Sequence, residues 1–200
     1  MKTSLATLGP WLLPCVLAFA APQKKDAPLI YVIMAVSSLG KSTQGEKLAK
    51  QLGVPFYEPD EYHSESNRKK ISAGQALTDE DRGPWLDRIR QEVIEKHLRE
   101  GKGAVVACSA LKRKYRQRLG LPHSRIQLVY LKGTLEMALA NNRKRQGHFA
   151  PEATVSNNFA VLEEPSPDEN AVVIEVESLG IEATFNRLVR ALHLRSSASS

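Results

Sequence analysis

Short apolar runs alternate with longer amphipathic stretches along most of this chain. The runs are rich in aliphatic and β-branched residues, and each has about the length of a strand. They cover residues 29–34, 54–57, 104–108, 126–131 and 171–176. Runs with few polar residues are typical of parallel strands that are buried on both faces. The alternation of such strands with helices predicts an α/β fold with right-handed crossovers.

Helical spacing is clearest between residues 78 and 100. Apolar residues recur there on one helical face, which indicates core packing; they are Trp85, Leu86, Ile89, Val93, Ile94 and Leu98. Thr78 is a suitable N-cap for this helix, acidic residues fill the first turn, and Gly101 ends it. Further helices are expected over residues 42–52, 64–71, 134–144 and 181–192.

The first apolar run leads into a segment with the layout of a phosphate-binding loop. Gly40, Lys41 and Ser42 end this loop and open the next predicted helix. In such a loop, backbone N–H groups surround a di- or triphosphate, a lysine reaches the β- and γ-phosphates, and a hydroxyl binds Mg²⁺. Nucleotide contacts are therefore expected along the whole loop: Ala35, Val36, Ser37, Ser38, Leu39, Gly40, Lys41, Ser42 and Thr43.

The loop departs from the strict pattern G-x-x-x-x-G-K-[ST]. Ala35 stands at the position of the first glycine, and Ser38 is a second suspect non-glycine residue. If either residue needs a positive φ, its Cβ costs roughly 1 kcal/mol. Leu39 is expected to add bulk beside the nucleotide. For the loop taken alone, the alternative is a chance Gly-Lys-Ser after a core strand.

An acidic cluster follows the second apolar run. Glu58 and Asp60 come directly after residues 54–57. Because the carboxyl ends of parallel strands face the ligand crevice, both carboxylates are placed to meet Mg²⁺ and an attacking hydroxyl. The alternatives are a solvated acidic turn and, for Asp60, a purely structural helix N-cap.

Composition limits the class of protein. The 200 residues are 42% hydrophobic and 25% charged, which suits one globular domain with tails. The net charge is +6, but the basic residues are scattered among acidic ones instead of gathered with aromatics, so a nucleic-acid partner is not expected. The two cysteines, Cys15 and Cys108, provide neither a disulfide framework nor a metal cluster.

The N-terminal segment resembles a targeting sequence. Lys2 precedes an apolar stretch over residues 8–20, and Ala18-Phe19-Ala20 has the small-x-small form of a signal-peptidase site. Pro10 and Pro14 interrupt the stretch, so an unstructured or organelle-directing extension is the alternative. The stretch is short for a transmembrane span of about 20 residues, and no other stretch approaches that length, so stable membrane association is not expected.

Later motifs make a family resemblance specific. They keep their order and spacing over the predicted domain, and they comprise His63, Asn67, Gly74, the segment TDEDRGPWL at 78–86, Cys108-Ser109-Ala110-Leu111-Lys112, Tyr115-Arg116, Arg145-Gln146-Gly147-His148-Phe149, Phe159 and Leu162-Glu163-Glu164-Pro165. From about residue 29 to residue 192, the chain resembles the gluconokinase family of small P-loop sugar-acid kinases.

The resemblance implies a fold class and a domain layout. The expected fold is α/β, a P-loop kinase-like three-layer sandwich similar to shikimate and adenylate kinases. It has a five-stranded, mostly parallel sheet, helices on both faces and a mobile lid. The layout is a signal-like leader and linker over residues 1–27, a kinase domain over 28–193 with its lid at about 143–158, and a polar tail over 194–200.

The resemblance also implies a reaction and the residues that serve it. The γ-phosphoryl group of ATP would pass, with Mg²⁺, to the 6-hydroxyl of D-gluconate to give 6-phospho-D-gluconate. Lys41, Asp60 and Arg145 are the expected catalytic residues: Asp60 orients or deprotonates the sugar hydroxyl, and Arg145, with Arg143 as a second candidate, reaches the transferred phosphate. Ser42 and Glu58, partly through water, would serve the metal.

Substrate contacts are expected from the residues that the motifs share. Arg82 is the leading partner for the gluconate carboxylate because a guanidinium binds carboxylates in a planar fork. The full expected set is Asp60, His63, Arg82, Ser109, Lys112, Arg116 and His148.

Several functional positions differ from the family pattern. The family has glycine at position 38, aspartate at 58 and arginine at 141, where this chain has Ser38, Glu58 and Asn141. Asn141 is still expected to contact the nucleotide. A degenerate family member that binds nucleotide or sugar acid with little or no turnover is therefore the second hypothesis. A shikimate kinase is less favoured, because residues 63–86 follow the gluconate pattern.

The resemblance further implies a cytoplasmic enzyme, and a homodimer is one expected assembly. Secretion is the alternative location, because of the leader.

Overall fold

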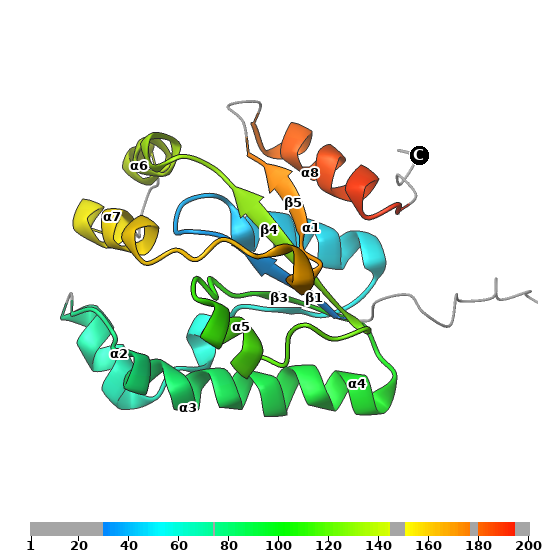
Figure 1. Ribbon diagram of the computed structural model, residues 1–200, viewed down its shortest axis with the longest axis horizontal. Coiled ribbons are helices and arrows are strands. Elements are labelled where there is room, and N and C mark those ends of the chain that lie inside the picture. The colour runs from blue at the N-terminus through cyan, green and yellow to red at the C-terminus, as the bar shows by residue number, and fades with distance from the viewer. Residues whose placement is uncertain (1–29, 74, 145–150, 177–179, 195–200) are drawn as a thin grey trace, which may run out of the picture.

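A parallel sheet covered by helices on both faces forms the centre of the molecule (Figure 1). The computed structural model describes residues 30–73, 75–144, 151–176 and 180–194. Its strands are β1 (Ile30–Met34), β2 (Phe56–Tyr57), β3 (Ala104–Ala107), β4 (Ile126–Lys132) and β5 (Val172–Glu175). They lie in the order β2-β3-β1-β4-β5, and every neighbouring pair is parallel. The predicted α/β kinase fold is confirmed.

The helices follow the strands in alternation. They are α1 (Lys41–Leu52), η1 (Pro59–Tyr62), α2 (Glu65–Ser72), α3 (Asp79–Ile89), η2 (Arg90–Glu95), α4 (Lys96–Glu100), α5 (Arg113–Arg118), α6 (Leu135–Lys144), α7 (Glu152–Ala160), η3 (Pro167–Glu169) and α8 (Gly180–Ala191). The helices α3, α4 and α5 cover one face of the sheet, and α1 and α8 cover the other (Figure 1).

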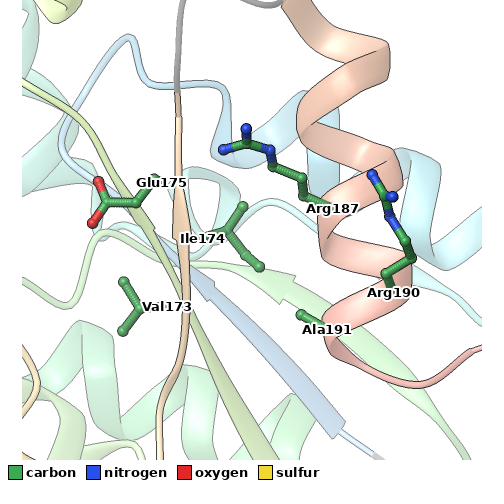
Figure 2. Close-up of a pocket in the computed structure, with 6 residues that line it drawn as sticks. All are labelled: Val173, Ile174, Glu175, Arg187, Arg190 and Ala191. Atoms are coloured by element: carbon green, nitrogen blue, oxygen red, sulfur yellow. The ribbon is translucent and has the colours of Figure 1, made fainter.

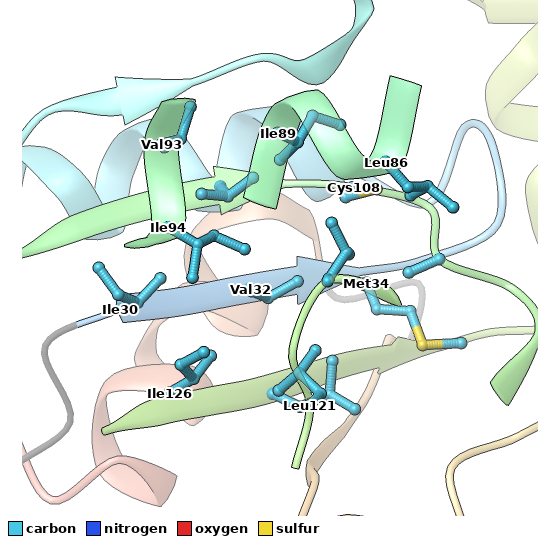
Figure 3. Packing of buried hydrophobic residues seen from close by; sticks show 14 of the residues in the cluster. Ile30, Val32, Met34, Leu86, Ile89, Val93, Ile94, Cys108, Leu121 and Ile126 are labelled. Atoms are coloured by element: carbon cyan, nitrogen blue, oxygen red, sulfur yellow. The ribbon is translucent and has the colours of Figure 1, made fainter. Parts of the chain in front are cut away.

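Strand β1 is buried on both faces because its alternate residues enter two separate cores. Ile30, Val32 and Met34 pack against the helix that carries Leu86 and Ile89 (Figure 3). The residues between them pack against α1 and α8. A strand with two covered faces must be apolar at every position, which explains its uninterrupted hydrophobic run.

Two predicted elements differ from the structure. The strand expected over residues 54–57 contains only β2, because the Val54 N–H bonds to Ala49 O at the end of α1 and Pro55 has no N–H to give. The helix expected from residue 78 to 100 is continuous, but residues 90–95 form the π-helical segment η2. Periodicity alone does not reveal such a change of helical pitch.

No helix among the described residues is long and apolar enough to cross a membrane. The leader at 1–27 and most of the polar tail lie outside the described residues.

Candidate active site

The phosphate-binding loop joins the carboxyl end of β1 to the N-terminus of α1. Gly40 is the N-cap residue, with a φ of 85°, and open space lies where its Cβ would point. No side chain caps the helix, and its first turn has no acidic residue. The first N–H groups of α1 are therefore free of side-chain acceptors, and the helix dipole adds partial positive charge at the same point. This end of α1 suits an anion.

The loop residues Ser38, Ala35 and Leu39 differ in backbone conformation and in burial. Ser38 has a φ of 68°, so the expected left-handed conformation is found there. Ala35 does not have a positive φ and is fully buried, so the expectation of strain at Ala35 was wrong. The Leu39 side chain is buried against Gly133, where a Cβ would come within 2.7 Å of Leu39 Cδ2. Leu39 therefore packs into the core, and the expected bulk beside a nucleotide was wrong.

The loop also contacts α6, which carries Asn141. The Asn141 Nδ2 atom donates to the backbone oxygen of Ser38 at 3.2 Å. Asn141 therefore contacts the loop at the backbone carbonyl of Ser38.

Two carboxylates follow β2 at the same edge of the sheet. Glu58 Oε1 is buried and accepts no hydrogen bond. Asp60 lies inside η1 and is exposed; its backbone oxygen accepts from the His63 N–H, but its side chain makes no hydrogen bond or ion pair with a described residue. Asp60 is therefore not the helix N-cap that was the structural alternative; Glu58 holds that position. Both carboxylates keep acceptor capacity.

Cys108 shows that the loop and the acidic segment converge. Burial raises the pKa of the Cys108 thiol to about 12; the Lys41 charge opposes this rise, and the Asp60 and Glu58 charges add to it. The phosphate-binding loop follows β1 and the acidic segment follows β2, and both strands pair in parallel with β3, so the two segments meet around the carboxyl end of β3. This edge of the sheet is where α/β folds bind ligands.

An aromatic pair, buried His63 and half-buried Trp85, supports the segment that carries Asp60. The Trp85 indole stacks on the His63 imidazole, and Trp85 Nε1 donates to Pro59 O at 2.8 Å. Burial lowers the pKa of His63, whose Nδ1 has no partner. The predicted core role of Trp85 was incomplete: the residue also positions η1. No periodic pattern could reveal this, because the contact depends on a hydrogen bond between segments far apart in sequence.

Two predicted substrate-binding cations lie around Tyr115. The Arg82 Cζ atom is 5.8 Å and the Lys112 Nζ atom 5.6 Å from the centre of the Tyr115 ring. Arg82 donates from Nη1 to Leu77 O, and its Nε and Nη2 atoms have no hydrogen-bond partner among the described residues. Lys112 Nζ lies 3.0 and 3.3 Å from the two oxygens of Asp79. Lys112 is thus paired, whereas Arg82 keeps donors to offer.

Sequence patterns missed Asp79 as part of this cluster. Hydrogen bonds from Lys114, Tyr115 and Lys112 hold the pKa of Asp79 well below its usual value. Asp79 had been assigned only to the first turn of its helix, and its partners became visible only when α5 packed beside α3.

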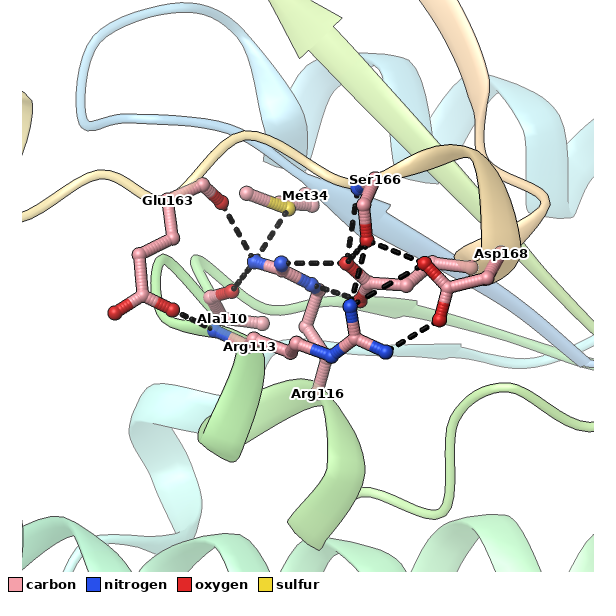
Figure 4. A network of polar contacts seen from close by, with 8 residues as sticks. Met34, Ala110, Arg113, Arg116, Glu163, Ser166 and Asp168 are labelled. Carbon is pink, nitrogen blue, oxygen red and sulfur yellow. Dashed lines mark hydrogen bonds and ion pairs between the residues drawn. The ribbon is translucent and has the colours of Figure 1, made fainter.

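Arg116 was expected to contact substrate, and the structure contradicts this. Its side chain is fully buried and forms a two-pronged ion pair with Glu169, with Nε–Oε2 at 2.5 Å and Nη2–Oε1 at 2.8 Å (Figure 4). Its Nη1 atom donates to the backbone oxygens of Ala110 and Glu163. A guanidinium whose three nitrogens all have partners and that is closed to solvent is structural.

Of the remaining predicted residues, Ser109 is half-buried, and Arg143 pairs with Glu152 at 2.7 Å. Arg145 and His148 lie outside the described residues, as does the middle of the expected lid. The described ends of the lid are helical, in α6 and α7.

A groove of about 500 Å³ lies elsewhere, between β5 and α8 (Figure 2). Its lining residues are Val173, Ile174, Glu175, Arg187, Arg190 and Ala191, none of which is a predicted site residue. The chemistry-bearing residues therefore lie apart from this groove.

Comparison with known proteins decides the family. The shikimate kinase family model matches residues 37–193. The probable gluconokinase of Mus musculus is 36% identical over 169 residues, which covers 76% of this chain and 91% of that protein. The chain belongs to the gluconokinase family.

Two further relatives support membership of the gluconokinase family. The gluconokinase of Gluconobacter oxydans is 37% identical over 150 residues, covering 75% of this chain and 84% of that protein. The crystal structure of a gluconokinase from Sinorhizobium meliloti has a TM-score of 0.74 and 33% identity, covering 83% of this chain and 92% of that one. As a member of the gluconokinase family, the chain is an ATP-dependent kinase.

Proposed function

We propose that the protein transfers the γ-phosphoryl group of ATP to the 6-hydroxyl of D-gluconate. One observation carries the proposal: the loop with Lys41 follows β1 and Asp60 follows β2, and these two parallel strands lie on either side of β3. Phosphoryl transfer needs positioning and charge neutralisation more than covalent chemistry. We infer D-gluconate as the acceptor from the relatives named gluconokinase.

The loop and α1 would hold the nucleotide. Lys41 would neutralise the β- and γ-phosphates, and the N–H groups at the start of α1 would bind their oxygens. Half-buried Lys41 makes no ion pair with a described residue, so its charge is available.

Glu58 and Ser42 fit a magnesium ion. Glu58 Oε1 is a buried oxygen that lacks a partner, and a buried carboxylate oxygen of this kind needs a cation or a water. The described residues contain no group of three or more His, Cys, Asp or Glu side chains placed to bind a metal. That suits Mg²⁺, which keeps several waters and takes few protein ligands. When bound, the ion would neutralise charge on the phosphates.

Asp60 and Arg82 would act on the sugar acid. Asp60 is exposed and unpaired, so its carboxylate can accept the proton of a hydroxyl within hydrogen-bond reach. The unpaired Nε and Nη2 atoms of Arg82 can form a fork with a carboxylate. Tyr115 and Lys112 would flank that carboxylate.

A coupled ADP assay tests the proposal. Turnover with D-gluconate and MgATP should exceed the rate without acceptor, and Lys41→Ala should abolish it. Asp60→Asn should lower kcat about 10²- to 10⁴-fold, whereas Glu61→Gln, its exposed neighbour in η1, should change it less than twofold. Equal ADP release with and without gluconate would refute the assignment. Turnover with shikimate but not with gluconate would show that shikimate is the acceptor.

A binder without turnover is the second candidate, and the strained Ser38 favours it. Calorimetry separates the two: tight MgATP binding without product formation would establish the binder.

A further inference from the structure

Three asparagine side chains connect the phosphate-binding loop to the helices α6 and α7. Asn141 donates to Ser38 O at 3.2 Å, and the Ser38 hydroxyl donates to Asn142 Oδ1 at 3.2 Å. From α7, Asn158 Nδ2 donates to Ser37 Oγ at 3.0 Å. The loop and these helices are separated by more than a hundred residues in sequence, so only the fold brings them together.

The contacts meet the loop where its backbone is least favourable. Ser38 has a φ of 68°, a conformation that costs a non-glycine residue free energy unless its surroundings impose it. Asn141 binds the carbonyl of Ser38 and Asn142 binds its hydroxyl, so these two polar groups of Ser38 are fixed. Asn142 is 1% exposed, which means that water does not compete for this contact.

We propose that Asn141, Asn142 and Asn158 are positioning residues that hold residues 36–40 in the shape that receives phosphates. We name these three residues the asparagine clasp. The effect of the clasp on nucleotide affinity rests on the proposed function, whereas its effect on the order of the loop backbone does not.

Helix α7 offers a matched control. Asn157 and Asn158 are neighbours of the same type in the same helix, but Asn157 is exposed and its side chain makes no hydrogen bond to a described residue. Asn158→Ala therefore removes the loop contact, and Asn157→Ala removes an equal side chain without it. Ser37→Ala removes the other partner of the same hydrogen bond.

The first experiment measures the ligand-free loop by ¹⁵N relaxation. A rigid backbone has order parameters near 0.85 and a flexible one below about 0.6. Residues 36–40 should lie near the rigid value in the parent and in Asn157→Ala, and should fall toward 0.6 in Asn158→Ala and Asn141→Ala. Residues 44–50 of α1 should not change. Unaltered order in the loop of both clasp variants would overturn the proposal.

The second experiment measures MgATP affinity by calorimetry. Asn158→Ala should weaken binding about tenfold, because the loop must be ordered at the moment of binding. Asn157→Ala should stay within twofold of the parent. In a Ser37→Ala background, Asn158→Ala should cost no further affinity, since its partner is already gone. Additive losses would show that Asn158 acts by another route and would contradict the clasp.

The two experiments fail independently. If the parent does not bind MgATP, the proposed function falls, and the relaxation data still decide whether the clasp orders the loop. If all variants bind MgATP like the parent while the loop loosens, the clasp is refuted as a positioning device. Asn142→Ala serves as a third variant; because Asn142 is buried, its melting temperature must be measured beside its affinity.

Discussion

Trp85 stacks on His63 with ring centroids 4.3 Å apart and the planes inclined by 17°. The same indole donates to Pro59 O, the first residue of η1. The long helix on one face of the sheet is therefore joined to the short segment that presents Asp60. A core residue of α3 thus determines where a candidate catalytic carboxylate lies.

Trp85→Phe should separate the stacking from the hydrogen bond. Phe keeps an aromatic ring against His63 but leaves Pro59 O without its donor. We expect kcat to fall about 10- to 100-fold, because small displacements of a reacting group are costly. Ile89→Val, one turn along the same helix, is the control: it should destabilise the fold by about 0.5–1.5 kcal/mol without changing kcat. Equal kcat in the two variants would refute the positioning role.

Ser38→Gly and Ala35→Gly should have different effects. Ser38 has a left-handed φ, so glycine there removes roughly 1–2 kcal/mol of strain, which offsets the added unfolded-state entropy. Glycine also removes the hydroxyl that donates to Asn142 Oδ1, so Ser38→Ala, which removes the same hydroxyl and keeps the Cβ, is the comparison. We expect Ser38→Gly to be at least as stable as Ser38→Ala. Ala35→Gly removes a buried methyl and should destabilise by roughly 1 kcal/mol. Thermal unfolding measures the three variants, and a Ser38→Gly variant less stable than Ser38→Ala would contradict the strain.

Arg116 and Glu169 should govern stability and not substrate binding. Glu169→Ala leaves a buried guanidinium unpaired, which should cost about 3–5 kcal/mol of unfolding free energy. Replacing both residues with leucine should cost less than the single change, because no buried charge remains. Urea unfolding of the three proteins measures this. A single variant as stable as the parent would show that the pair is dispensable.

The same pair predicts the direction of a pH effect. The hydrogen bonds from Arg116 lower the pKa of Glu169 below its ordinary value of 4.5. The unfolded state therefore binds the proton first, so the stabilisation is complete above pH 4.5 and is lost as the pH falls through the folded-state pKa. The unfolding free energy of the parent should fall more steeply below pH 4.5 than that of Glu169→Gln. Parallel curves would contradict this assignment.

Cys108 should resist alkylation in the folded protein. Burial raises the pKa of its thiol to about 12, and the side chain is 1% exposed, so little thiolate forms at pH 8. Iodoacetamide should modify the Cys108 peptide only when urea unfolds the chain, as mass spectrometry of digests would show. Rapid labelling of the native protein would mean that the carboxyl end of β3 opens.

The sequence by itself determined the fold and much of the phosphate-binding loop. Uninterrupted apolar strands such as β1 are typical of strands buried between two layers, and Gly40-Lys41-Ser42 after such a strand is typical of a loop that opens a helix. These features are local, because they depend on periodicity and on the backbone freedom of single residues.

Only the tertiary structure decided which polar residues are free to act. Arg82 and Arg116 both lie in motifs that resemble the gluconokinase family, yet packing leaves Arg82 with donors that have no partner among the described residues and pairs Arg116 with Glu169. Likewise, Asn158 became a partner of Ser37 only when α7 reached the loop. Burial and ion pairing depend on residues that are distant in sequence, and a one-dimensional pattern contains no information about which distant partner a side chain meets.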